Sequence, residues 1–156
     1  MRSPLLSKQV RGTIARAQQE ASSRGCSRTE EIHLLIVLVS HENEPSSQIL
    51  RNELGETAFN LMVDRLNELA KGRVRVIKRS SPGPSLVRLV EGAVAEDRIY
   101  QVGSIYSEHL FLSYIRGDDF FFLRGYLDFC GGVLLIQRVR EQLIESLRKR
   151  DSHKRF

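Results

Sequence analysis

Apolar residues in the first part of the chain recur with the spacing of helices and not of strands. The first stripe consists of Val10, Ile14, Ala17 and Ala21. Because these intervals are four and three residues, the stripe predicts a helix over residues 7–24, with Ser7 as its N-cap. Gly25 is predicted to end this helix.

Three more helical segments follow before residue 72. Residues 28–43, "RTEEIHLLIVLVSHEN", carry an apolar run, with Ser27 or Thr29 as the predicted cap and two glutamates in the first turn, where the helix dipole favours acidic side chains. Pro45 opens the next segment and Gly55 ends it. The fourth segment, residues 57–72, has the stripe Phe59, Met62, Val63, Leu66 and Leu69. The first half of the chain is therefore predicted to contain four short helices.

Residues 72–85, "GRVRVIKRSSPGPS", are predicted to be a linker. Their last six residues hold two prolines, a glycine and three serines, which cannot propagate a helix. The alternation in "RVRVI" is compatible with a brief strand that has no evident partner.

The helical pattern restarts after this linker as an internal repeat. At an offset of 76 residues, His33, Leu34, Leu35 and Leu38 correspond to His109, Leu110, Phe111 and Tyr114. A shorter offset of 73 aligns residues 49–55 with residues 122–128, which implies that three residues are lost from a loop. The last stripe is Leu135, Ile136, Val139, Leu143 and Leu147. The prediction is an all-α domain of two tandem four-helix repeats with pseudo-two-fold symmetry.

This single domain of 156 residues divides into repeat one at about 6–71, the linker, repeat two at about 86–148 and a basic tail at 149–156. Its hydrophobic fraction of 41% and charged fraction of 28% are typical of a soluble globular protein. No apolar run is long enough to span a membrane and no secretory signal is visible, so a cytoplasmic location is predicted. Cys26 and Cys130 are predicted to be reduced and packed.

The net charge of +5 comes mainly from two basic stretches, residues 71–79 and 148–156. Neither is interleaved with the aromatic side chains on which bases stack, so nucleic acid is not favoured as a partner; such a binder would show a steep salt dependence. The phosphate-binding pattern G-x-x-x-x-G-K-[ST] is absent from the sequence. ATP hydrolysis is therefore not predicted for this chain.

The repeats carry a recurring triplet that ends in histidine and leads into an apolar helix. It is Ser107, Glu108 and His109 in the second copy, and Glu31, Ile32 and His33 in the first. With the segment "LSKQVRGTIARAQQEASSRG" at 6–25, these triplets resemble the Thr-Glu-His triplets of the N-terminal domain of Clp-family AAA+ unfoldases, which has two Clp repeats. The resemblance covers about Leu6 to Leu147.

The resemblance implies a non-catalytic recognition domain without a cofactor or metal. In some family members, similar to the C-type Clp unfoldases, the two triplet glutamates hold the guanidinium of phosphoarginine-marked substrates. Only Glu108 matches directly, beside Ser107; Glu30 or Glu31 substitutes in the first copy if the helix start shifts. From its position alone, Glu108 is equally a first-turn carboxylate favoured by the helix dipole.

The two repeat histidines lack a cysteine or a second histidine at metal-ligand spacing. Each imidazole is therefore predicted to hydrogen-bond backbone at a helix start. The other unusual feature is the aromatic run Phe120, Phe121 and Phe122. Three adjacent aromatics cannot share one helical face, so they either wedge between the repeats or line a peptide-binding groove.

The leading functional hypothesis is a module that binds unfolded or tagged protein substrates, or adaptor proteins, and delivers them to an AAA+ ring. One alternative is the N-domain of the unfoldase that recycles type VI secretion sheaths, with a sheath subunit as partner. Another is a stand-alone accessory protein that docks on a Clp complex. The candidate binding residues are Glu31, Ser107, Glu108, Phe120, Phe121 and Phe122.

Overall fold

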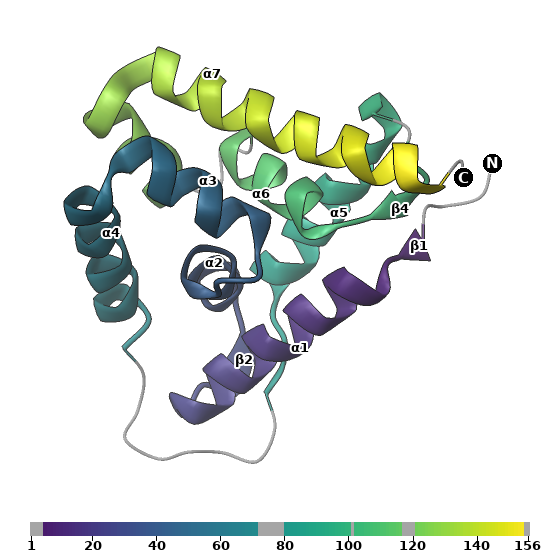
Figure 1. Cartoon of the computed structure of the whole chain (residues 1–156). Coiled ribbons are helices and arrows are strands. Elements are labelled where there is room, and N and C mark those ends of the chain that lie inside the picture. The colour runs from purple at the N-terminus through teal and green to yellow at the C-terminus, as the bar shows by residue number, and fades with distance from the viewer. Residues whose placement is uncertain (1–4, 72–79, 101, 117–120, 155–156) are drawn as a thin grey trace.

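The computed structural model describes residues 5–71, 80–100, 102–116 and 121–154. Its helices are α1 (Lys8–Ser23), α2 (Glu31–Ser40), α3 (Pro45–Leu54), α4 (Glu56–Leu69), α5 (Pro84–Tyr100), α6 (Ser107–Arg116) and α7 (Phe121–Lys154) (Figure 1). Four two-residue strands join them: β1 (Leu5–Leu6), β2 (Arg28–Thr29), β3 (Ser81–Pro82) and β4 (Ser104–Ile105). The predicted all-α class is confirmed.

Helix α7 is two helices that meet at a kink, so the described part of each repeat has four helices. Gly132 at the kink has φ 69°, a value that favours glycine, and Gly55 between α3 and α4 has φ 81°. The two glycines are therefore equivalent, at an offset of 77 residues. The predicted offset of 73 in this part of the repeat is wrong: the second copy gains one residue between α6 and the kink instead of losing three.

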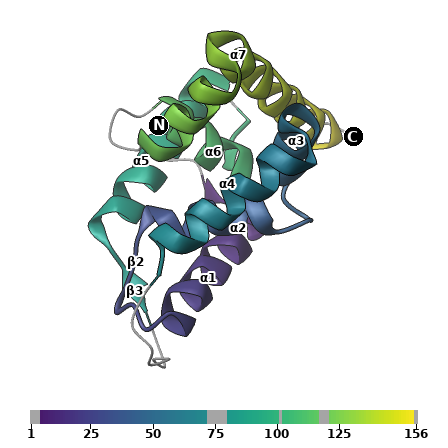
Figure 2. The ribbon, with the colours of Figure 1, turned by 90° about the vertical axis from the view of Figure 1, so that its left-hand side faces the viewer.

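The strands connect the repeats by exchange. β1 pairs in parallel with β4 (Figure 1), and β2 pairs in parallel with β3 (Figure 2). The first strand of each repeat therefore joins the second strand of the other. Residues 81–85, predicted as linker, belong to the second repeat instead, because Pro82 is in β3 and Pro84 begins α5. Proline is tolerated in the first turn of a helix, where its missing N–H is not needed. The "RVRVI" segment lies outside the described residues.

The central helices of the core are α2 and α6. Every residue from His33 to Val39 is buried, and so is every residue from Ser107 to Ile115. A helix that is apolar on all sides must be surrounded, and α2 lies at the centre of Figure 1 with α1, α3 and α4 around it. The second half of α7 packs across α6 and α3. Residues 149–154 continue this helix, so the predicted basic tail is largely helical.

Two smaller expectations differ in outcome. No helix in the described ranges has both the length and the apolar character needed to span a bilayer. Cys130 is exposed and Cys26 is half-buried, so the prediction that both are packed is wrong for Cys130. Both cysteines are free.

Candidate functional site

The repeat histidines cap the starts of the two central helices. The Glu30 N–H donates to His33 Nδ1 at 2.9 Å, and the Tyr106 N–H donates to His109 Nδ1 at 2.9 Å. The predicted role of these imidazoles is confirmed. The predicted cap of α2 is wrong, because the N-cap is Glu30; Thr29 lies in β2 and its buried hydroxyl donates to Ser80.

Burial lowers the pKa of both histidines. For His33, the positive charge of Arg24 adds to the effect of burial. For His109, the carboxylate of Asp97, 3.3 Å from Nε2, opposes the effect of burial without overcoming it. Because Nδ1 accepts a backbone N–H in each case, the neutral imidazole carries its proton on Nε2.

These lowered pKa values predict that acid destabilises the domain. Below the ordinary histidine pKa of 6.5, the unfolded chain binds protons at these two histidines more readily than the folded chain does. The contribution of the neutral histidines to stability is therefore complete above pH 6.5, and it is lost as the pH falls from 6.5 through the lower pKa values of the folded state. Urea unfolding at a series of pH values measures this loss. The His33→Gln/His109→Gln variant keeps an acceptor at each cap and should lose less stability on acidification; an equal loss in both proteins contradicts the assignment.

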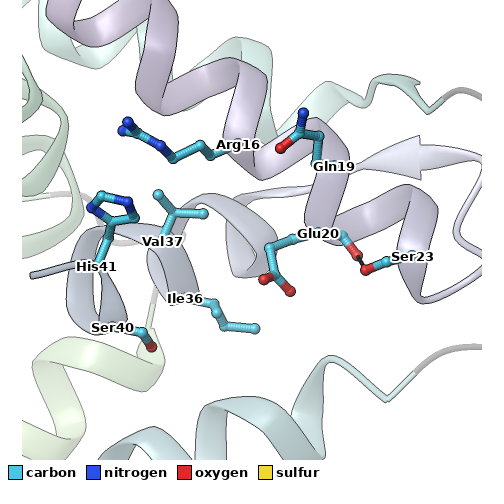
Figure 3. Close-up of a pocket in the computed structure, with 8 residues that line it drawn as sticks. All are labelled: Arg16, Gln19, Glu20, Ser23, Ile36, Val37, Ser40 and His41. Carbon is cyan, nitrogen blue, oxygen red and sulfur yellow. Dashed lines mark hydrogen bonds between the residues drawn. The ribbon is translucent and has the colours of Figure 1, made fainter.

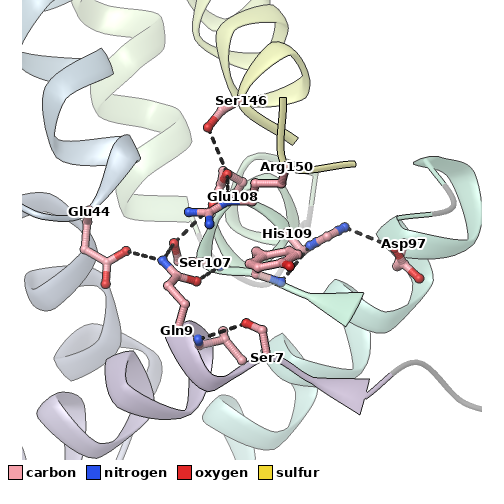
Figure 4. A network of polar contacts seen from close by, with 11 residues as sticks. Ser7, Gln9, Glu44, Asp97, Ser107, Glu108, His109, Ser146 and Arg150 are labelled. Atoms are coloured by element: carbon pink, nitrogen blue, oxygen red, sulfur yellow. Dashed lines mark hydrogen bonds and ion pairs between the residues drawn. The ribbon is translucent and has the colours of Figure 1, made fainter. Parts of the chain in front are cut away.

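The triplet glutamate Glu108 is fully buried and bound by the chain's own C-terminal helix (Figure 4). Its Oε2 accepts hydrogen bonds from Arg150 Nε at 2.7 Å and Ser146 Oγ at 2.9 Å. The Arg150 guanidinium also lies 4.4 Å from the centroid of the Tyr106 ring. Glu108 therefore holds a guanidinium, and that guanidinium comes from α7.

Ser107 belongs to the same buried network. Its N–H donates to Gln9 Oε1 at 2.9 Å, and Gln9 Nε2 donates to both Ser107 Oγ and Glu44 Oε2. Glu44 also accepts from the Thr13 hydroxyl. The network links α1, the start of α3 and the start of α6 beneath α7 (Figure 4).

The predicted binding role of Ser107 and Glu108 requires the end of α7 to move away, because neither side chain is exposed to a partner. Glu31 is half-buried; its N–H donates to Ser85 Oγ and its carbonyl accepts from the Tyr114 hydroxyl. Among the described residues, the Glu31 carboxylate makes no hydrogen bond or ion pair with a member of the Glu108 network. The roles of all three residues in binding a partner stay predictions.

An apolar cleft of about 630 Å³ lies between α4 and the first half of α7. Its lining is Arg65, Glu68, Leu69, Phe122, Gly125, Tyr126 and Phe129. The Phe122 and Tyr126 rings stack with their centroids 6.1 Å apart, and Phe129 is 89% exposed. Phe122 is thus the member of the aromatic run that the structure places in a cleft; Phe120 lies outside the described residues, as does the side chain of Phe121.

An equivalent cleft of about 330 Å³ lies between α3 and the second half of α7. Its lining is Pro45, Gln48, Ile49, Gln142, Glu145, Ser146 and Lys149. At the offset of 77 residues, Leu69 corresponds to Ser146 and Phe129 to Asn52. The lining of one cleft therefore consists mostly of polar residue types, and the lining of the other includes three aromatic residues; they are called the polar cleft and the aromatic cleft. Sequence reasoning missed Leu69, Tyr126 and Phe129, which an alignment on Gly55 and Gly132 would have revealed.

Within the described ranges, no group of three or more His, Cys, Asp or Glu side chains could hold a metal ion. The residues of the candidate sites instead form a duplicated helical scaffold with one aromatic cleft and one buried ion-pair network. This arrangement defines a repeat-built α-helical domain.

The chain belongs to the Clp repeat (R) N-terminal domain family, whose model matches residues 5–125. The fold is similar to the Hsp104 N-terminal domain from Candida albicans, with a TM-score of 0.70, 12% identity and 91% of each chain covered. It is also similar to a structure from preliminary investigations of a malarial protein secretion system, with a TM-score of 0.71, 14% identity, and 92% of this chain and 95% of that chain covered. No curated protein matches the chain in sequence.

Proposed function

We propose that this domain is a non-catalytic recognition module of a Clp-type AAA+ unfoldase, and that it binds apolar segments of unfolded substrates or adaptor proteins in the α4–α7 cleft. The observation that carries the proposal is the difference between the two equivalent clefts. Since the polar copy is compatible with the same fold, folding does not require the exposed Leu69 and Phe129 of the other copy. Exposed apolar patches of this kind mark interaction sites.

The cleft has the physical properties of a binding site for protein. Aromatic side chains dominate the energetics of protein interfaces, and covering Phe129 fully would contribute about 1.5 to 3 kcal/mol to binding. Gly125 lies between the aromatic residues on the same helix, and a Cβ there would meet nothing within 4 Å. Packing within the fold therefore does not require a glycine at position 125. Its lack of a side chain leaves a notch that could hold a side chain of the partner.

The role in an unfoldase is proposed from the family. The ATPase ring would receive the segments that this domain binds. A sheath subunit, or a Clp complex on which a stand-alone protein docks, is a different occupant of the same cleft.

A binding titration tests the proposal. The probe is a fluorescently labelled, permanently unfolded polypeptide, with anisotropy as the readout. The variant Leu69→Ser/Phe129→Asn introduces the residues found at the equivalent positions, Ser146 and Asn52, into the aromatic cleft. It should weaken binding at least about tenfold, since each lost apolar contact is worth on the order of 1 kcal/mol or more.

The matched control is Gln48→Ala/Lys149→Ala in the polar cleft, which should bind like the parent. Equal affinity of parent and aromatic-cleft variant overturns the proposal, and so does a folded parent that binds neither the unfolded probe nor an adaptor or sheath subunit. If the parent binds an adaptor or a sheath subunit and not the unfolded probe, the cleft is specialised for that partner.

A further inference from the structure

A third cleft lies between α1 and α2, on helices that do not line the aromatic cleft. Its volume is about 510 Å³. Figure 3 shows its lining: Arg16, Gln19, Glu20, Ser23, Ile36, Val37, Ser40 and His41. Glu20 lies near Ile36 at one end of the view, and Arg16 and His41 lie at the other.

The second repeat shows what fits such a cleft. At the offset of 76 residues, Glu20 corresponds to Glu96 and Ser40 to Arg116. In the second repeat the guanidinium of Arg116 lies 3.0 Å from Glu96 Oε1, and the Glu96 side chain is only 3% exposed. Glu96 is therefore covered by Arg116, which comes from α6, the helix equivalent to α2.

The first repeat keeps the glutamate and lacks that arginine. Ser40 is too short to reach across, and the Glu20 side chain is 37% exposed. Among the described residues, Arg24 on the same helix contacts the Glu20 carboxylate, through Oε2 at 3.2 Å. Glu20 Oε1 therefore remains for a second donor.

The residues at the helix contact differ between the α1–α2 cleft and the smaller cleft lined by Glu96 and Arg116. In the second repeat, a Cβ at Gly92 would overlap the Ser113 hydroxyl, so α5 approaches α6 closely at this point. The equivalent residues of the first repeat are Arg16 and Val37, which have larger side chains and line the α1–α2 cleft. The cleft lined by Glu96 and Arg116 measures about 170 Å³.

We propose that the α1–α2 cleft binds the guanidinium of an arginine side chain presented by another protein, with Glu20 as its anionic partner. The apolar Ile36 side chain suits the methylene stem of the arginine. Arg24 Nε takes one lone pair of Oε2, so Oε1 and the second lone pair of Oε2 remain as acceptors. Guanidinium is preferred over ammonium because its planar donors can bind both of these acceptors at once. Arg16 and His41, at the far end of the cleft, favour an acidic residue near the arginine in the bound segment. The site is separate from the aromatic cleft, and the inference does not rest on the function proposed for that cleft.

The test uses the whole chain and Nα-acetyl-arginine amide as the probe, with backbone amide chemical shifts as the readout. We expect saturable shifts in the second half of α1 and in α2, and no such shifts with the neutral citrulline analogue. Glu20→Gln should weaken binding at least about tenfold, the usual cost of a lost hydrogen bond to a charged group. Glu42→Gln, an exposed acid that does not line the cleft, is the matched control.

Ser40→Arg supplies the missing arginine from within the chain. It should block binding of the probe, and its amide spectrum should remain that of a folded protein. Conversely, Arg116→Ser exposes Glu96 and should create a second set of saturable shifts in α5 and α6. The absence of saturable shifts in the parent, equal shifts with the citrulline analogue, or unchanged binding by the Ser40→Arg variant would each overturn the proposal.

Discussion

Arg150→Ala is expected to lower the free energy of unfolding by about 3 kcal/mol, the lower end of the usual loss when one member of a buried ion pair is removed, because Glu108 is fully buried and Arg150 is 28% exposed. The substitution leaves the Glu108 carboxylate, which has no exposed surface, with Ser146 and Ser107 as its remaining hydrogen-bond donors. It also removes the cation above the Tyr106 ring. Urea unfolding followed by circular dichroism at neutral pH measures the change.

The control for this variant is Arg148→Ala, which removes another arginine from the same helix. Arg148 is 74% exposed in its contact with Glu145, and surface pairs contribute little, so the expected loss is below about 0.5 kcal/mol. The double variant Glu108→Met/Arg150→Met should be more stable than Arg150→Ala, because it leaves no buried charge. Equal losses for Arg150→Ala and Arg148→Ala would show that Glu108 is not buried as described.

Phe111→Ala is the second substitution with a large expected effect. It should lower the free energy of unfolding by about 3 to 5 kcal/mol, because the burial of the ring is lost and a cavity remains in its place. Phe111 is fully buried in α6, and Leu35 holds the equivalent position in α2. Phe111→Leu should therefore cost less, about 1 to 1.5 kcal/mol, because most of the volume is kept. Thermal and urea unfolding both measure these losses.

The matched control for the ring is Phe129→Ala. Phe129 is 89% exposed, so the same substitution should change stability by no more than about 0.5 kcal/mol. A large loss at Phe129 would indicate that this side chain serves the fold, and it would contradict the assignment of the cleft to binding. A small loss at Phe111 would contradict the central position of α6.

The sequence predicts the central helices well because their signal is local and duplicated. His33 and His109 recur 76 residues apart, each ahead of an apolar run, and a capping histidine followed by a buried helix needs no long-range information. The strands were not predictable in the same way. Two residues such as Ser81 and Pro82 are too short to show alternation, and they pair because two copies of the repeat exchange strands.

The candidate sites depend on contacts that periodicity does not encode. Glu108 meets Arg150, which is 42 residues later in the chain, after α7 has turned at Gly132. The position of that turn also fixes which residues of the two repeats correspond. With the 73-residue offset, Phe129 corresponds to Glu56, which does not line the cleft between α3 and α7, so the alignment hides the difference between the clefts.

The two repeats have kept the residues that fold them and have diverged at their surfaces. Ile32 replaces the glutamate in the first triplet, where it is half-buried against the core. Ser40 holds the position of Arg116, which covers Glu96, and Phe129 holds the position of Asn52 in the first repeat. The helices that carry these residues are present in both repeats.

A map of where an unfolded polypeptide contacts the domain tests the proposed recognition site most directly. Backbone amide shifts recorded during a titration with that polypeptide should change along residues 61–69 of α4 and 122–134 of α7, on both sides of the aromatic cleft. The residues that line the polar cleft, within 45–49 and 142–149, should change little. Shifts of equal size at both clefts, or shifts confined to another part of the domain, would contradict the account.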